Sequence, residues 1–494
     1  MNQLRIGSRL ATSDAACTRL STKLCICALG LTFCLSSPAQ AQPVTVGASG
    51  QARPTFSSES TMTQATTINS LRDARKEDQL TQTVANPKSP PLGDSEAAIR
   101  SFRVNIPEEK IVDLRRRLVA TRWPTKELVG DRSQGVQLAP LKALVRYWAT
   151  DYDWRKAEAR LNAYPQFMTN IDGVDIHFIH VRSKEKNALP VIITHGWPGS
   201  VFELLQVIDP LINPTAHGGS ATDAFDVVLP SLPGYGFSDA PNELGWNSGR
   251  IARAWGQLMQ RLGYTRYVAQ GGDVGAAVTD AMGRQAPEGL IGIHLNLLSG
   301  ASGLADKLPA KSEQELAAHK ALATFRASGF GYFLEQSTRP QTIGYSLLDS
   351  PVGLAAWLLD HDTDSYYKIS RAFVDGQPVG GLTRESIVDN ITLYWLTGSG
   401  ASAARWYWEL GQVQAAARAG GAAPPAVTVP VGFTTFPGDI WAAPRSWVET
   451  VYPRLAYYNE ADRGGHFAAW EEPALFASEL RAAFRPLRKL PVKD

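Results

Sequence analysis

Cysteine is scarce in this sequence. Only four of the 494 residues are cysteines, and all four lie near the N-terminus, at Cys17, Cys25, Cys27 and Cys34. If that segment is cleaved off, the remaining chain can have no disulfide, no thiolate metal site and no cysteine nucleophile. Its chemistry must then come from other side chains.

Long apolar runs and an excess of one charge are also missing. The apolar run at residues 24–35 is shorter than the roughly 20 residues that span a bilayer, and no later stretch is long enough. Lysine and arginine number 49 against 47 acidic residues, a net charge of +2, which argues against binding to nucleic acid or an anionic membrane. We therefore expect a small-molecule partner in a pocket, and we keep a homo-oligomer as a second hypothesis.

The first 41 residues are typical of a secretory signal. A basic start precedes the apolar run, and Ala39-Gln40-Ala41 is an A-x-A cleavage site. The basic residues are Arg5, Arg9, Arg19 and Lys23. An uncleaved membrane anchor is the alternative. Cleavage would leave 45 positive and 46 negative residues, a net charge of −1, and would give an exported protein, periplasmic or secreted, without a stable membrane span.

Composition divides the rest of the chain. Residues 42–93 are rich in Ser, Thr, Gln and Pro and are predicted to be a disordered linker, because so few large apolar residues cannot offset chain entropy. Residues 94–166 are predicted to be a helical domain, since Ile111, Leu114 and Leu118 recur at helical spacing. Pro107 and Pro124 favour a helix between them.

An alternation of strands and helices follows, which predicts an α/β fold with a mostly parallel sheet covered by helices on both faces. We expect a first core part at 167–299, a helical cap at 300–422 and a second core part at 423–494. Strands are predicted at residues 167–171, 174–181, 191–194, 225–229, 267–270, 290–297, 427–436 and 455–459. One helix is predicted where apolar residues mark a single face, namely Ile251, Trp255, Leu258, Met259 and Leu262, and another is predicted over residues 472–484.

Asp273 occupies the strongest motif. The segment Gln270-Gly271-Gly272-Asp273-Val274-Gly275 lies between a predicted strand and a predicted helix, the layout of a nucleophile elbow, G-x-Nuc-x-G. Glycines on both sides allow the sharp turn that exposes the central side chain. The alternative is an ordinary helix N-cap, a position that Asp suits well.

Two further loops carry candidate chemistry. His466, in Gly464-Gly465-His466-Phe467-Ala468, follows the last predicted strand, and Asp439 follows the strand before it; Asp462 is the alternative acid. The order nucleophile, acid, histidine is that of α/β-hydrolases. In that fold the loop His195–Ser200 and the elbow supply oxyanion-hole amides, here those of Trp197 and Val274.

Other ionisable residues are predicted to be structural. His195 is expected to have a structural role despite its place in the loop. Asp360, Asp362 and Asp364 lie around His361 and could suggest a metal site, but we expect a solvated face there. The histidines expected to be structural or solvent-exposed are His177, His180, His217, His294, His319 and His361.

The three loops together make the chain resemble the microsomal-type epoxide hydrolases, including juvenile-hormone, fungal and bacterial enzymes. The matching motifs are HGWPGS, GGDxG, Phe-Pro-x-Asp and Gly-Gly-His-Phe-Ala. Residues 95–165 resemble that family's N-terminal domain, residues 349–355 match a cap stretch, and the resemblance covers roughly residues 95–490. It implies an α/β-hydrolase fold and an enzyme that converts an epoxide and water to a diol.

The resemblance also implies two cap tyrosines that donate to the epoxide oxygen. The matching positions are Tyr332 and Tyr407. The tyrosines most easily mistaken for them are Tyr345, Tyr366, Tyr367 and Tyr394. Many relatives carry an aromatic residue where this chain has Val274, a change that bears on pocket shape more than on mechanism.

The expected mechanism uses Asp273 as nucleophile, His466 as general base and Asp439 as its orienting acid, with no metal and no organic cofactor. A haloalkane dehalogenase shares the nucleophile but commonly has tryptophan at the Val274 position. An esterase would need Ser or Cys at position 273, and a non-catalytic binding homologue would usually lack a triad member. Trp357, Trp395, Trp406 and Trp408 suggest a bulky apolar epoxide.

Overall fold

The computed structural model describes residues 98–298, 304, 307–361, 380–421 and 424–489. The predicted signal and linker lie outside this range, as do Asp362, Asp364, Tyr366 and Tyr367. Among the described residues no helix combines the length and the apolar character needed to cross a bilayer.

A nine-stranded sheet forms the centre of the described chain, in the order β1-β2-β3-β5-β4-β6-β7-β8-β9. The strands from β5 to β9 pair in parallel, whereas β1, β2 and β3 add an antiparallel edge. The strands are β1 (Arg100–Phe102), β2 (Gln166–Ile171), β3 (Val174–Val181), β4 (Leu189–Thr194), β5 (Phe225–Pro230), β6 (Tyr267–Gly271), β7 (Leu290–Leu295), β8 (Val431–Thr435) and β9 (Leu455–Glu460). The prediction of a mostly parallel sheet is confirmed.

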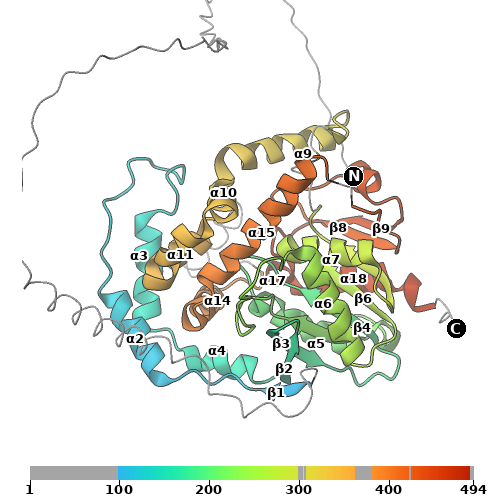
Figure 1. Cartoon of the computed structure of the whole chain (residues 1–494), viewed down its shortest axis with the longest axis horizontal. Helices are drawn as coiled ribbons and strands as arrows, with labels where there is room; N and C mark the ends of the chain where they lie inside the picture. The colour runs from blue at the N-terminus through green and yellow to red at the C-terminus, as the bar shows by residue number, and fades with distance from the viewer. Residues whose placement is uncertain (1–97, 299–303, 305–306, 362–379, 422–423, 490–494) are drawn as a thin grey trace, which may run out of the picture. The chain divides into compact units, whose positions relative to one another are not determined.

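Two pairs of helices cover the sheet. α6 (Ser248–Arg261) packs on α7 (Asp273–Gln285) (Figure 1). On the other side, α5 (Leu205–Ile212) packs on α18 (Pro473–Phe484). The glycine Gly283 of α7 lies against Ile293 of β7, whereas the preceding strand residue, Gly292, lies against Leu487 after α18. Because successive strand residues point to opposite faces, the two pairs lie on opposite sides of the sheet. The short helices α16 (Arg445–Val451) and α17 (Ala468–Glu471) complete the core.

The region before β2 is helical, as its periodicity predicts, with one exception. Its helices are α2 (Glu108–Val119), α3 (Leu138–Thr150) and α4 (Trp154–Leu161). The chain first forms β1, which pairs antiparallel with β2 at the edge of the sheet. β1 could not be predicted from the sequence because it has three residues, mostly exposed, and no alternating pattern.

In its described residues the cap contains helices and no named strand, and it lies beside the N-terminal helices (Figure 1). α14 contacts both α2 and α4, and α12 contacts α2. The cap helices are α9 (Glu313–Thr324), α10 (Gly331–Thr338), α11 (Pro340–Asp349), α12 (Pro351–Leu359), α14 (Arg384–Thr397) and α15 (Gly400–Arg418), with a π-helical turn at Phe325–Gly329.

Two strands are shorter than predicted. β7 ends at Leu295 rather than at residue 297, and β8 begins at Val431 rather than at residue 427. Pro430 precedes β8 and has no N–H to donate to a neighbouring strand, which explains the later start. Both strands still end beside the loops that carry the candidate chemistry.

Candidate active site

Asp273 lies at a sharp turn between β6 and α7. Only Gly272 separates the two elements, and Gly272 is the N-cap of α7. Asp273 is the first helical residue and has a φ of +47°, the left-handed region that costs a residue other than glycine about 1–3 kcal/mol. The alternative interpretation, an ordinary N-cap aspartate, is therefore wrong. Such strain is typical of a functional turn.

Two glycines permit this turn. A Cβ on Gly271 would overlap the backbone of Gly275, and a Cβ on Gly275 would overlap the carbonyl of Thr194 at the end of β4. Glycine at both positions lets α7 begin directly against the sheet. The Asp273 side chain is thereby held at the C-terminal edge of the parallel strands, where ligands bind in open α/β sheets.

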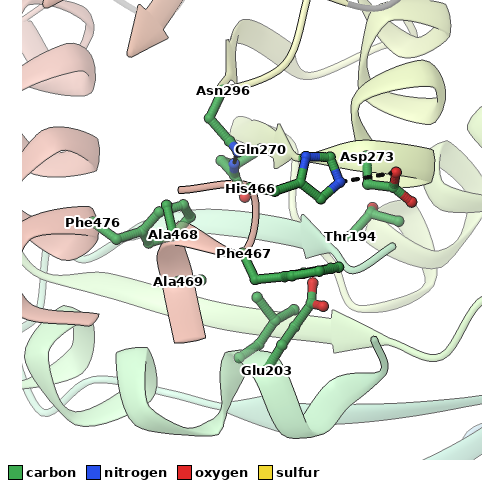
Figure 2. A pocket seen from close by; sticks show the side chains of 12 residues that line it. Thr194, Glu203, Gln270, Asp273, Asn296, His466, Phe467, Ala468, Ala469 and Phe476 are labelled. Atoms are coloured by element: carbon green, nitrogen blue, oxygen red, sulfur yellow. Dashed lines mark hydrogen bonds and ion pairs between the residues drawn. The ribbon is translucent and has the colours of Figure 1, made fainter. Parts of the chain in front are cut away.

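The Asp273 carboxylate has a different neighbour at each oxygen. Its Oδ1 accepts a hydrogen bond from the Trp197 amide at 2.7 Å, and its Oδ2 lies 3.2 Å from Nε2 of His466 (Figure 2). Val274 is the second residue of α7, so its amide is one of the helix's first four, which have no intrahelical acceptor. The structure thus brings the HGWPGS loop, the elbow and the histidine loop together.

The imidazole of His466 connects two carboxylates. Its Nδ1 lies 2.7 Å from Oδ1 of Asp439, while its Nε2 faces Asp273. The loops after β8 and β9 that carry Asp439 and His466 are joined by a parallel bridge between Gly438 and Gly465. The alternative acid, Asp462, is exposed and pairs with Arg463. Of the two acids, Asp439 is the one in contact with the histidine.

Burial and charge act against each other at this pair. Burial alone would raise the pKa of Asp273, but hydrogen bonding and charge from His466 keep it below its ordinary value, with help from the Trp197 amide. Burial alone would lower the pKa of His466, but Asp273 and Asp439 raise it well above its ordinary value. Asp273 is therefore held as a carboxylate, the form that acts as a nucleophile.

The two cap tyrosines lie against Trp197. The ring of Tyr332, on α10, stacks on the Trp197 indole at 4.8 Å, and the ring of Tyr407, on α15, meets the same indole edge-on at 5.8 Å. Burial, and then the charge of Asp273, raise the pKa of Tyr407 well above its ordinary value, so its hydroxyl keeps its proton. Tyr345 is exposed, and Tyr394 donates to the carbonyl of Gly199, so neither competes for this position.

His361 was placed wrongly from the sequence. Its side chain is buried, its Nε2 lies 3.1 Å from the Tyr332 hydroxyl and 4.0 Å from Oδ2 of Asp273, and its ring lies 4.9 Å from that of His466. The neighbouring Asp360 pairs with Arg132 instead. The prediction that His361 is structural or exposed is therefore wrong. His361 lies just after the end of α12, and no local motif indicates that the chain turns into the site there.

Three of these side chains also have the composition of a metal site. Oδ2 of Asp273 and one ring nitrogen each of His361 and His466 lie within 4.8 Å of one another. The same atoms already face one another or a tyrosine hydroxyl in hydrogen-bonding geometry. We therefore assign them to acid–base chemistry.

The remaining histidines have other partners. His195 is buried between the Gly196 carbonyl and the amide of Leu232, and burial lowers its pKa to about 4, which keeps it neutral. This placement agrees with the structural role expected for it. The other five contact groups outside the site, namely Ser231 and Gln166 for His177, Tyr264 for His180, Asp209 for His217, Thr434 for His294 and two backbone carbonyls for His319.

The HGWPGS loop is attached to the cap by three hydrogen bonds with residues of α14. Asn390 donates to the Pro198 carbonyl at 2.7 Å and accepts from Ser200 at 2.7 Å, and Tyr394 donates to the Gly199 carbonyl at 2.7 Å. These partners could not be predicted from the sequence because they lie about 190 residues away along the chain. They fix the loop that presents the Trp197 amide.

Aromatic rings line the site. Phe333 meets Tyr407 edge-on at 5.3 Å, and Phe467 meets His466 at 4.8 Å. Two of the cap tryptophans have other partners: Trp357 donates to Gln336, and Trp395 lies under the Arg117 guanidinium. The apolar wall is made by Trp197, Phe333 and Phe467.

Comparisons with known proteins agree with this geometry. The model for the epoxide hydrolase N terminus matches residues 99–204, and the model for the alpha/beta hydrolase fold matches residues 190–298. The chain is 52% identical over 394 residues to a Stigmatella aurantiaca (strain DW4/3-1) protein assigned as an epoxide hydrolase, covering 79% of this chain and 86% of that protein. It is 37% identical to epoxide hydrolase 1 of Oryctolagus cuniculus, covering 80% and 90%.

Solved structures lead to the same family. The crystal structure of juvenile hormone epoxide hydrolase from the silkworm Bombyx mori superposes with a TM-score of 0.69 at 30% identity, covering 80% of this chain and 95% of that one. The Aspergillus niger epoxide hydrolase superposes with a TM-score of 0.67 at 31% identity, covering 79% and 97%. The chain therefore belongs to the epoxide hydrolase family of the α/β-hydrolase fold and is an enzyme that hydrolyses epoxides.

Proposed function

We propose that the protein converts an epoxide and water to a vicinal diol through an ester formed on Asp273. One observation carries this proposal. The Asp273 carboxylate is bound at one oxygen by the Trp197 amide and faces at the other a histidine that is itself held by Asp439. This arrangement suits a nucleophile that must first attack carbon and then be released by water.

In the first step Oδ2 of Asp273 attacks a ring carbon from behind. The new C–O bond forms as the ring C–O bond breaks, and the bonding electrons move to the epoxide oxygen. That oxygen takes a proton from a hydroxyl of Tyr332 or Tyr407. A positioned acid of this kind typically contributes about 10²–10⁴-fold. His361, in contact with the Tyr332 hydroxyl, can hold that hydroxyl in place.

In the second step water attacks the carbonyl carbon of the ester. Its proton passes to Nε2 of His466, whose Nδ1 remains bonded to Asp439. The amides of Trp197 and Val274 stabilise the oxyanion. Collapse of the intermediate breaks the bond to the diol oxygen, which takes the proton from His466. The regenerated carboxyl group of Asp273 then ionises, and its proton replaces the one that the tyrosine gave up.

The identity of residue 273 and its neighbours disfavours the other reactions. A serine nucleophile would form an ether with no carbonyl for water to attack, so Asp suits ring opening. A haloalkane dehalogenase needs donors for a halide, commonly a tryptophan at the position of Val274. A binding protein would not need a complete contact series from Asp439 through His466 to Asp273.

We propose an apolar epoxide with an aryl or bulky alkyl substituent as the substrate. The rings of Trp197, Phe333 and Phe467 around Asp273 support this class, because they offer apolar surface next to a few polar groups.

We also propose that residues 1–41 export the protein to the periplasm or the medium. N-terminal sequencing of the mature protein tests that proposal, and an intact Met1 would overturn it.

The reaction is tested by diol formation from styrene oxide with purified residues 42–494. We expect diol from the parent and from Asp462→Ala, a control that removes an exposed acid of the histidine's own loop. We expect none from Asp273→Ala, a loss of about 10⁴-fold or more. Equal diol formation by Asp273→Ala would overturn the mechanism.

A further inference from the structure

A cavity of about 20 Å³ lies next to Asp273 and His466. That volume holds about one water molecule, which needs roughly 10–15 Å³, and is far too small for a substrate. The cavity is bounded by side chains of the sheet core and of the histidine loop, among them Phe467, with Glu203 on one side (Figure 2). A water in it would lie beside the two groups that the ester hydrolysis uses.

Glu203 is the unexpected group in this wall. It belongs to the short turn Val201–Leu204 after the HGWPGS loop, and its side chain is buried. Its Oε1 accepts the Gly196 amide at 3.3 Å, whereas its Oε2 is buried without a hydrogen-bond partner in the described part of the chain. An unpaired buried carboxyl oxygen costs about 1–3 kcal/mol, so a ligand is expected to offset it.

Other polar groups in the wall already have partners. Gln270 donates to Asn296, and the Thr194 hydroxyl accepts from the indole of Trp255. Figure 2 shows the Glu203 carboxyl group pointing toward the side of the cavity where Asp273 and His466 lie. Burial, and then the charge of Asp273, raise the pKa of Glu203 well above its ordinary value. In the ester intermediate Asp273 carries no charge, so this repulsion is absent and Oε2 of Glu203 can accept a hydrogen bond from the water.

We propose that this cavity holds the hydrolytic water and that Glu203 is the residue that positions it. The water donates one O–H to Nε2 of His466 and the other to Oε2 of Glu203, which directs its oxygen lone pair at the ester carbon of Asp273. The proton removed goes to His466, and Glu203 exchanges no proton. This role rests on the ester mechanism proposed above and concerns its second step alone.

Glu203→Gln separates water positioning from support of the loop. The glutamine carbonyl can still accept the Gly196 amide, but its NH₂ group places a donor where the water needs an acceptor. Excess enzyme is mixed with styrene oxide and quenched at successive times. The ester is measured by the intact mass of the enzyme, and the released diol is measured in the same samples. Glu479→Gln is the matched control, since Glu479 is also buried but is bonded to Thr434, Tyr457 and Asn459.

We expect Glu203→Gln to form the ester within about twofold of the parent rate and to hydrolyse it about 10–100-fold more slowly, so that ester accumulates. The control should leave both steps unchanged. Hydrolysis within twofold of the parent would overturn the inference, and so would equal slowing of both steps, which would leave Glu203 only a support for the loop. Diol formed by the parent without any ester would overturn the ester mechanism itself, and this inference with it.

Discussion

The groups around Asp273 come from two regions that differ in how they are held. Asp273, Asp439 and His466 follow the ends of sheet strands, and His466 contacts both carboxylates directly. Tyr332 and Tyr407 stand on cap helices and reach the site through ring contacts with Trp197. The parallel strands set the positions of the sheet groups, whereas the positions of the two cap tyrosines depend on how the cap helices pack above the sheet.

This difference matches the two halves of the proposed reaction. Ester hydrolysis uses the sheet groups alone, while ring opening needs the cap as well. Variants should therefore divide by region: changes in the sheet groups should block or trap the ester, and changes in the cap should slow its formation.

Replacement of His466 by glutamine should have the largest effect after loss of the nucleophile itself. Without a base to take the water's proton, we expect turnover to fall by about 10⁴-fold while ester still forms. Intact-mass spectra should show the enzyme heavier by one substrate. A variant that makes no ester would show that ring opening also depends on His466, and the division by region would fail.

Asp439→Asn should cost slightly less, about 10³-fold in ester hydrolysis, because the imidazole remains but loses its orienting partner. Asp439 is one of two carboxylates that raise the pKa of His466, so its removal should lower that pKa. Ester hydrolysis needs neutral His466, and its rate rises with pH through this pKa. Single-turnover pH profiles should show the rise at lower pH in the variant; an unmoved profile would contradict the assignment.

Tyr332→Phe and Tyr407→Phe should each slow ester formation by about 10–100-fold, because each removes one donor to the developing alkoxide. Ester hydrolysis should stay at the parent rate. Rapid-quench measurements of both steps check this, with Tyr345→Phe, at an exposed position of the cap, as the control. Slower hydrolysis in either variant would mean that the cap also acts in the second step.

His361→Phe should give the smallest effect, up to about tenfold in ester formation, since His361 acts through Tyr332 rather than on the substrate. The phenyl ring can keep the contacts with Trp197 and Phe467. If the double variant with Tyr332→Phe is slower than Tyr332→Phe alone by the same factor, the two residues act independently and the proposed support of the hydroxyl is wrong.

The sheet half of the site could be predicted from sequence because its signals are local. Each of its loops follows an apolar strand, and glycines at Gly271 and Gly275 mark a turn that no other residue allows. The ends of parallel strands meet at one edge, so three local signals predict one site. Even the choice of Asp439 over Asp462 followed from strand order, without any contact being known.

The cap half could not be predicted in the same way. Nothing near His361 signals that its ring turns toward Tyr332, 29 residues earlier, and an acid-rich neighbourhood suggests a solvated face instead. Tyr332 and Tyr407 were identified only through family resemblance. Glu203 did carry a signal, a single carboxyl within an otherwise apolar stretch, but its burial depends on the packing of the loop above it.

The HGWPGS loop is held from two sides, by Glu203 through the Gly196 amide and by α14 through Asn390 and Tyr394. The Trp197 amide of the oxyanion hole lies on a loop of the sheet region, but α14 helps to hold that loop in position. On heating, local opening of the cap should abolish activity before the sheet unfolds, since regions within one protein open with different free energies. The catalytic half-life would then report the stability of one helix contact and not that of the whole molecule.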